Sequence, residues 1–134
     1  MLSRRAAVAF AVGDLITAAL VMVGVFVGLP SRWPVVDVPA VVLAALHTAS
    51  GAGLLAGRGW GPGVARVASA VSLALGLALI TVLALTASWL SGVYGPVGLG
   101  GAVVLALVAA LALPYLVALP VLRLVCMRGA RGPA

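Results

Sequence analysis

Charge is scarce in this chain, and lysine, glutamate and a second histidine are absent altogether. Its 134 residues include two acidic side chains, so that only 7% of residues are charged while 65% are apolar. A soluble domain needs a charged surface, which this composition does not supply. A lipid bilayer can instead be the solvent for most of the exterior, and the sequence therefore predicts an all-α integral membrane protein.

The same absences limit the chemistry that the protein can perform. With no glutamate, no lysine and no glycine-rich phosphate-binding loop, the chain lacks a catalytic constellation, and we expect it not to be an enzyme. A lone histidine without ligand-spaced thiolates or carboxylates predicts no metal, haem or other cofactor. The single cysteine, Cys126, excludes an internal disulfide.

Four apolar segments follow one another along the chain, and each is long enough to span a membrane of about 30 Å. They cover roughly residues 6–29, 38–56, 64–90 and 97–125. The three breaks between them are short and rich in proline and glycine, which predicts antiparallel neighbouring helices. The whole chain, 1–134, is thus expected to form one four-helix transmembrane domain.

Arginine placement predicts the orientation of this domain. If the chain starts in the cytoplasm, only Arg32 lies outside, and seven arginines lie on the cytoplasmic side: Arg4, Arg5, Arg58, Arg66, Arg123, Arg128 and Arg131. This bias predicts cytoplasmic N and C termini. Arg66 and Arg123, which lie near helix ends, are expected to extend to the lipid headgroups. The net charge of +6 is then explained by topology and anionic lipid, with no nucleic-acid partner.

The abundance of alanine, glycine, valine and arginine, without lysine, is typical of a GC-rich bacterial genome. We therefore expect the protein in the bacterial plasma membrane.

Asp14 and His47 are the titratable side chains that fall well inside the apolar segments. At a helical rise of 1.5 Å per residue they lie about 12 Å and about 14 Å from the same membrane face, so we predict an intramembrane polar pair. Tyr115, Ser50 and Thr17 are candidates to join the pair in a cluster or pathway. The pair either fixes helix register by a hydrogen bond or couples proton or cation movement, and its protonation state is not determined by the sequence.

Small residues predict where helices pack closely, because lipid offers no hydrophobic driving force between apolar helices. Some of these faces are expected to hold the monomer together, and one is a candidate to bind another chain. The glycines predicted to serve in helix packing are Gly13, Gly24, Gly28, Gly53, Gly57 and Gly76.

Two prolines, Pro114 and Pro120, predict a kink in the fourth helix, since each removes a backbone donor. The kink either fits the helix to its neighbours or marks a broken helix that lines a substrate site.

These features favour a non-enzymatic multi-pass protein that acts as a small subunit or accessory of a larger membrane assembly. Its partners would be the lipid bilayer and other membrane protein chains, in a hetero- or homo-oligomer. The alternative is a proton-coupled small-molecule transporter that works as a homo-oligomer, with Asp14 and His47 as coupling residues. In its four short helices and the acidic residue of the first, the chain resembles the small multidrug resistance transporters. It departs from them in having aspartate in place of their glutamate and in lacking their aromatic pattern in the third helix.

Overall fold

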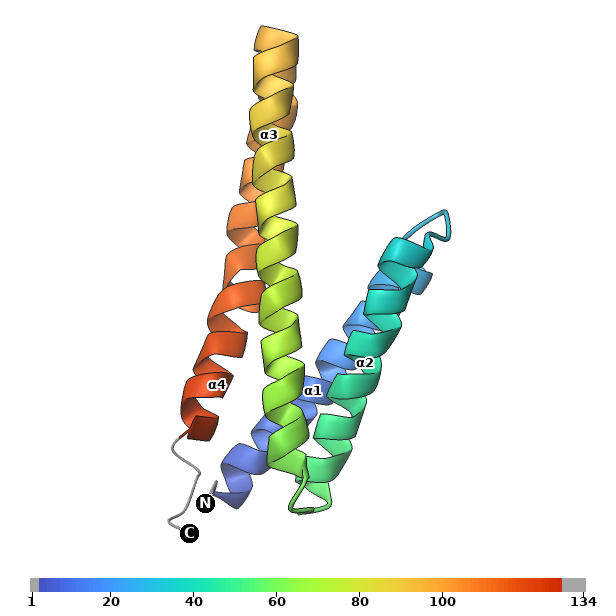
Figure 1. Ribbon diagram of the computed structural model, residues 1–134, viewed down its shortest axis with the longest axis vertical. Coiled ribbons are helices and arrows are strands. Elements are labelled where there is room, and N and C mark those ends of the chain that lie inside the picture. The colour runs from blue at the N-terminus through green and yellow to red at the C-terminus, as the bar shows by residue number, and fades with distance from the viewer. Residues whose placement is uncertain (1–2, 129–134) are drawn as a thin grey trace. The chain divides into compact units, whose positions relative to one another are not determined.

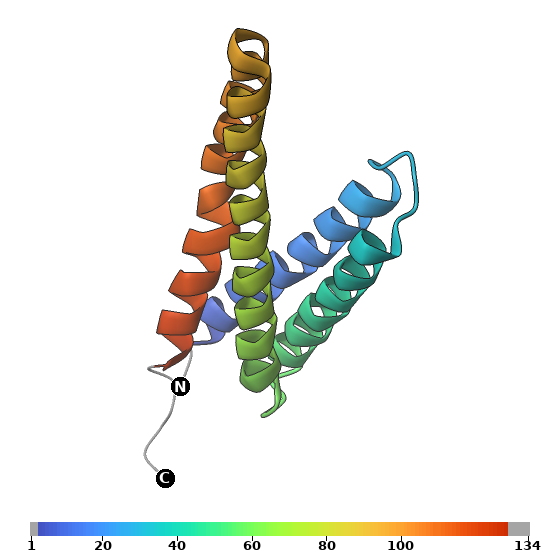
Figure 2. The same ribbon diagram turned by 45° about the horizontal axis from the view of Figure 1, so that its top comes forward.

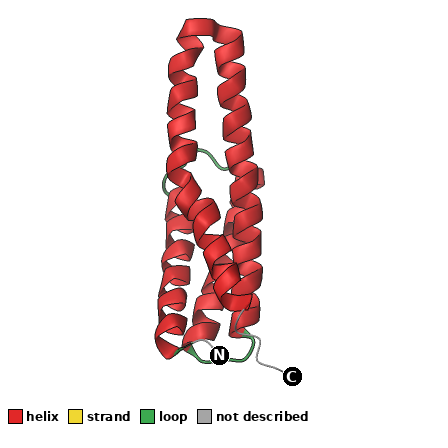
Figure 3. Ribbon diagram, turned by 90° about the vertical axis from the view of Figure 1, so that its left-hand side faces the viewer, coloured by secondary structure: helices red, strands yellow, loops and turns green. Residues whose placement is uncertain are grey.

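The computed structural model describes residues 3–128, which are almost entirely helical (Figure 3). The elements in order are α1 (Arg4–Phe26), α2 (Pro34–Leu55), α3 (Gly61–Leu113), the π-helical η1 (Pro114–Ala118) and α4 (Leu119–Arg128) (Figure 1). No strand occurs in this described part of the chain, and the predicted all-α class is confirmed. Arg131, predicted to be cytoplasmic, lies outside the described residues.

Three helical stretches are long and apolar enough to cross a membrane: Arg4–Phe26, Pro34–Leu55 and Gly61–Met127. The first two fall on the predicted segments 6–29 and 38–56. The third stretch is 67 residues long and contains both remaining predicted segments, because helical structure continues on either side of a single non-helical residue, Gly95.

The residues pack into two compact units. Unit 1 comprises Met1–Val71 and Arg123–Ala134, and therefore includes α1, α2, the start of α3 and the end of α4. Unit 2 comprises Ser72–Leu122, which includes the rest of α3, η1 and the start of α4.

In unit 1, α1 begins after Ser3, whose hydroxyl caps the first turn, and its other end is capped by Arg32. The Arg32 guanidinium donates to the carbonyls of Val25 at 3.1 Å, Phe26 at 2.6 Å and Leu29 at 3.2 Å. It also lies 4.9 Å from the centroid of the Phe26 ring. The last carbonyls of a helix have no partner within the helix, so this arginine satisfies groups that would otherwise lack one.

α2 starts with Pro34 at its first position, where a missing N–H costs nothing, and ends in a glycine turn. Gly57 has a φ of 62°, and its N–H donates to Leu54 at 3.2 Å while the N–H of Arg58 donates to Gly53 at 3.0 Å. This is the Schellman arrangement, in which a left-handed residue closes a helix. Gly57 thus ends α2, a role that its assignment as a helix-packing glycine did not include.

α1 and α2 lie side by side and antiparallel (Figure 1, Figure 2). The face that α1 buries repeats at helical spacing and consists of Ala11, Asp14 and Ala18. α2 meets it with Gly51, where an added Cβ would lie 2.9 Å from the Leu15 Cγ and 3.0 Å from the Ala11 carbonyl oxygen. The two backbones therefore approach closely through alanine and glycine, as expected for helices in lipid.

The predicted glycine stripe of α1 is not this packing face. Gly13 and Gly24 have open space where a Cβ would be, and a Cβ on Gly28 would meet only the Gly24 carbonyl of its own helix end. The α1–α2 contact therefore uses the neighbouring alanine face, and the glycine stripe stays a predicted contact surface for another chain.

Two other predicted packing glycines do allow close approach. Gly53 lies against the Trp60 ring and Gly61 in unit 1, so its side of α2 is already occupied within the chain. Gly76 lies against Leu116 of η1 in unit 2, where an added Cβ would be 2.6 Å from the Leu116 carbonyl oxygen.

Unit 2 is a helical hairpin whose two arms meet at Gly95 (Figure 1). Gly95 has φ 56° and ψ −134°, a conformation open almost exclusively to glycine, and Pro96 begins the returning arm. Trp89 and Tyr94 make an edge-to-face contact beside this turn, with ring centroids 6.0 Å apart. The reversal therefore depends on one glycine.

The predicted kink prolines lie on either side of a wider helical turn. Pro114 begins η1, and the N–H of Leu119 donates to its carbonyl. Pro120 follows at the start of α4. A π-helical turn accommodates a missing proline donor without interrupting the helix, so helical backbone continues through this segment.

Gly95→Ala is expected to lower the free energy of unfolding by about 2 kcal/mol, because an L side chain is strained at this φ and ψ. The measurement is denaturant unfolding of the purified protein in detergent micelles. Gly92→Ala is the matched control, since Gly92 lies three residues earlier, has no positive φ and has open space at its Cβ. That control is expected to be neutral or to stabilise the helix by about 1 kcal/mol. Equal effects of the two changes would contradict the proposed role of Gly95.

Candidate functional site: a buried ionic cluster

Asp14 is the centre of a polar cluster inside unit 1, and its carboxylate is fully buried. It accepts three hydrogen bonds from side chains: from His47 Nδ1 at 2.6 Å and Arg123 Nη1 at 2.5 Å on Oδ1, and from Ser50 Oγ at 2.5 Å on Oδ2. We call Asp14, His47, Ser50 and Arg123 the Asp14 cluster. All four side chains are buried, so the cluster is enclosed by the protein.

The helices place two of the donors by their periodicity. His47 and Ser50 are three residues apart on α2 and therefore lie on one face, the face that packs against α1. Asp14 lies between Ala11 and Ala18 on the buried face of α1. The structure thus brings together the predicted pair, Asp14 and His47, and adds the candidate Ser50.

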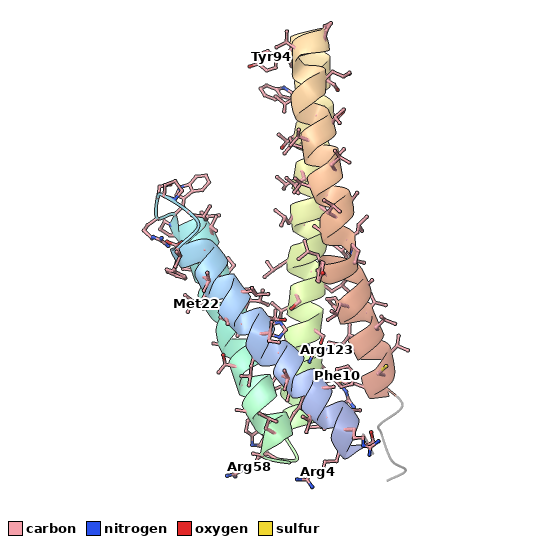
Figure 4. The ribbon with its side chains drawn as sticks, turned by 180° about the vertical axis from the view of Figure 1, so that it is seen from behind. Arg4, Phe10, Met22, Arg58, Tyr94 and Arg123 are labelled. Carbon is pink, nitrogen blue, oxygen red and sulfur yellow. The ribbon has the colours of Figure 1, made fainter. Side chains whose placement is uncertain are left out.

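Arg123 is the member of the cluster that the sequence did not indicate. Its side chain was expected to extend to the headgroups, but it is only 4% exposed, and the guanidinium reaches Asp14 instead. The same side chain donates to the Phe10 carbonyl at 3.0 Å and lies 5.4 Å from the Phe10 ring centroid, as the labelled residues in Figure 4 illustrate. The expectation for Arg123 is therefore wrong. A buried carboxylate needs a counter-ion, and Arg123 supplies it to Asp14 instead of placing its charge at the lipid headgroups.

One signal in the sequence bears on this pairing. Asp14 is the one carboxylate inside the apolar segments, and Arg123 is the arginine that falls furthest inside the fourth segment. A buried carboxylate needs a counter-ion, so the two isolated opposite charges are natural partners. Their separation of 109 residues hides this relation from local patterns.

Asp14 and Arg123 form an ion pair inside the cluster. An arginine side chain is always protonated, so Arg123 neutralises the Asp14 carboxylate. Asp14 Oδ1 accepts the hydrogen bond from His47, so His47 Nδ1 carries a hydrogen.

A second arginine holds the end of α4. Arg66 Nη2 donates to the carbonyl of Met127 at 2.8 Å, and Met127 is itself fully buried. The small apolar core of unit 1 consists of Ala11, Leu54, Ala65 and Met127, with Phe10 packed against it. The expectation that Arg66 extends to the headgroups is corrected in the same way as that for Arg123, since its guanidinium bonds to α4.

The other two candidates are placed differently. The Thr17 hydroxyl donates to the Gly13 carbonyl of its own helix at 2.8 Å, so this contact is local to α1. Tyr115 belongs to η1 in unit 2, and its side chain is 74% exposed. Within residues 3–128 no group of three or more histidine, cysteine or acidic side chains lies close enough to hold a metal ion. The interactions that the cluster makes are hydrogen bonds and an ion pair.

Comparison with known proteins adds no further information on this site. No protein-family model matches the chain, and searches of curated proteins and of solved structures find no significant match. The class that the fold defines is an all-helical protein with three stretches long and apolar enough to cross a membrane.

Arg123→Met is expected to lower the free energy of unfolding by about 3 to 5 kcal/mol, because it leaves the Asp14 carboxylate buried without a counter-ion. Adding Asp14→Asn to this variant removes the unpaired buried charge and is expected to restore part of the lost free energy of unfolding. The measurement is a double-mutant cycle of unfolding free energies in micelles. Additive effects of the two changes would show that the side chains are not coupled.

Two buried serines provide a matched pair of tests. Ser50 donates to Asp14 across the helix interface, whereas Ser69 donates to the Ala65 carbonyl of its own helix at 2.8 Å. Ser50→Ala is expected to destabilise unit 1 by about 1.5 to 3 kcal/mol, the range for a hydrogen bond to a charged group. Ser69→Ala is expected to be nearly neutral in the same unfolding assay. A loss at Ser69 as large as that at Ser50 would contradict the special role of the Asp14 carboxylate.

Proposed function

We propose that this chain is a multi-pass membrane protein with four transmembrane segments in the bacterial plasma membrane and both termini in the cytoplasm. The three stretches of span length support the membrane assignment. The third is interrupted at Gly95, and each of its arms exceeds the roughly 20 residues that a span requires. Large apolar side chains are exposed along every helix, where lipid would cover them.

We infer further that the protein is a non-enzymatic small subunit or accessory of a larger membrane assembly. The observation that carries this proposal is that the Asp14 cluster is closed. Three side-chain donors bind the carboxylate, Arg123 supplies its counter-ion, and all four side chains are buried. Such a cluster holds the helices together. The outer surface of the chain is then available for interaction with lipid and partner chains.

A proton-coupled transporter, assembled from several copies, is the second candidate. The observation that favours it is a buried histidine whose Nδ1 lies 2.6 Å from an intramembrane carboxylate. The ion pair weighs against it, because proton uptake by Asp14 would require Arg123 to give up its counter-ion in every cycle.

Native mass spectrometry of the tagged protein, purified in mild detergent from its own membrane, is the first test. The subunit proposal expects a stoichiometric partner chain of different mass. A homo-oligomer alone would contradict it and favour the transporter.

His47→Asn separates the two candidates in function. Asparagine keeps an N–H donor near the position of Nδ1 but does not titrate, so a structural cluster should retain its fold and its assembly. In a proton-coupled transporter the same change should abolish pH-driven flux in liposomes. His47→Leu, which removes the donor as well, is the control for structural loss. Retained flux in His47→Asn would remove His47 from any coupling role.

A further inference from the structure

Three exposed arginines of unit 1, Arg4, Arg5 and Arg58, have no anion to pair with in the described part of the chain. The sequence has two acidic side chains: Asp14 is paired with Arg123 in its cluster, and Asp37 lies 3.9 Å from Arg32. Arg4, Arg5 and Arg58 are exposed and make no side-chain ion pair with any residue from 3 to 128. Figure 4 labels Arg4 and Arg58 at the same end of unit 1. Their counter-ions must therefore come from outside these residues.

Two of these arginines border a groove. Arg4 and Arg5 line it together with Val8 and Ala9, and its surface is mostly apolar. Each arginine is four residues before one of the apolar residues, so Arg4 neighbours Val8 and Arg5 neighbours Ala9 on the surface of α1. The groove thus has two arginines in the first turn of α1 and an apolar lining that continues along the helix.

We propose that this groove is a binding site for one anionic phospholipid. The phosphodiester would accept hydrogen bonds from the Arg4 and Arg5 guanidinium groups, whose planar forks match phosphate oxygens. An acyl chain would lie along Val8 and Ala9. The choice of an anionic phospholipid follows from charge complementarity. The groove combines arginines that have no counter-ion with an apolar surface that continues along α1 from its N-terminal end. The inference rests on the proposed membrane embedding and not on the subunit role.

The test measures lipid retention on the full chain. The protein is reconstituted in nanodiscs of equal phosphatidylglycerol and phosphatidylcholine with identical acyl chains, released into mild detergent and examined by native mass spectrometry for bound lipid. The site predicts a strong excess of phosphatidylglycerol adducts. Arg4→Gln with Arg5→Gln is expected to reduce them about 25-fold, at about fivefold for each arginine near an anionic headgroup.

Arg58→Gln is the matched control, since it removes one exposed arginine from the same end of unit 1 but outside the groove. It is expected to change retention by less than about twofold, below the roughly fivefold effect of a charge at the site. Ala9→Phe keeps every charge but fills the groove, and it is expected to reduce retention clearly.

Three results would overturn the proposal. Equal retention of the two lipids would show no preference for the anionic headgroup. An effect of Arg58→Gln as large as that of a single groove arginine would show a diffuse surface charge. Full retention in Ala9→Phe would show that the groove holds no acyl chain. Each of these leaves membrane embedding intact, whereas a chain that does not enter nanodiscs at all would instead refute the membrane assignment.

Discussion

Burial of one carboxylate is the constraint on which the arrangement of unit 1 depends. Asp14 has no access to water, and an ionised group in such a site is stable only when opposite charge and hydrogen-bond donors surround it. This requirement explains why His47 and Ser50 share the α1-facing side of α2 and why Arg123, 109 residues away in the chain, is drawn to the same oxygen. The end of α4 is held against α1 as a consequence.

Outside the Asp14 cluster, little polar chemistry remains in the interior of the protein. Arg32 is occupied in capping α1, and Arg66 in bonding to Met127, so these two arginines perform structural tasks at helix ends. Exposed charge then remains mainly on arginines such as Arg4 and Arg58. A protein whose surface is apolar with a basic end is suited to binding lipid and other helices. That combination underlies the proposed accessory role.

Close packing of α1 and α2 shows how small residues act in such a protein. Glycine at position 51 permits contact because it faces Ala11 and Leu15, whereas Gly13 and Gly24 face open space. The useful property is therefore the small size of a residue on the buried face. Alanine is small enough on α1, whereas position 51 of α2 has room only for glycine. A stripe of glycines predicts a surface on which helices can approach each other closely, but it does not predict which surface is used.

The sequence by itself determined the helical class, the position of the apolar stretches and the importance of Asp14 and His47. These follow from local quantities, since the transfer of an apolar run to lipid and the cost of a charge within it add up residue by residue. Only the tertiary structure decided that Arg123 completes the cluster, that Thr17 bonds within its own helix, that Tyr115 is exposed, and that alanines form much of the buried face of α1. Those outcomes depend on how helices rotate about their axes and on where long side chains reach, and both are set by packing between residues distant in the chain.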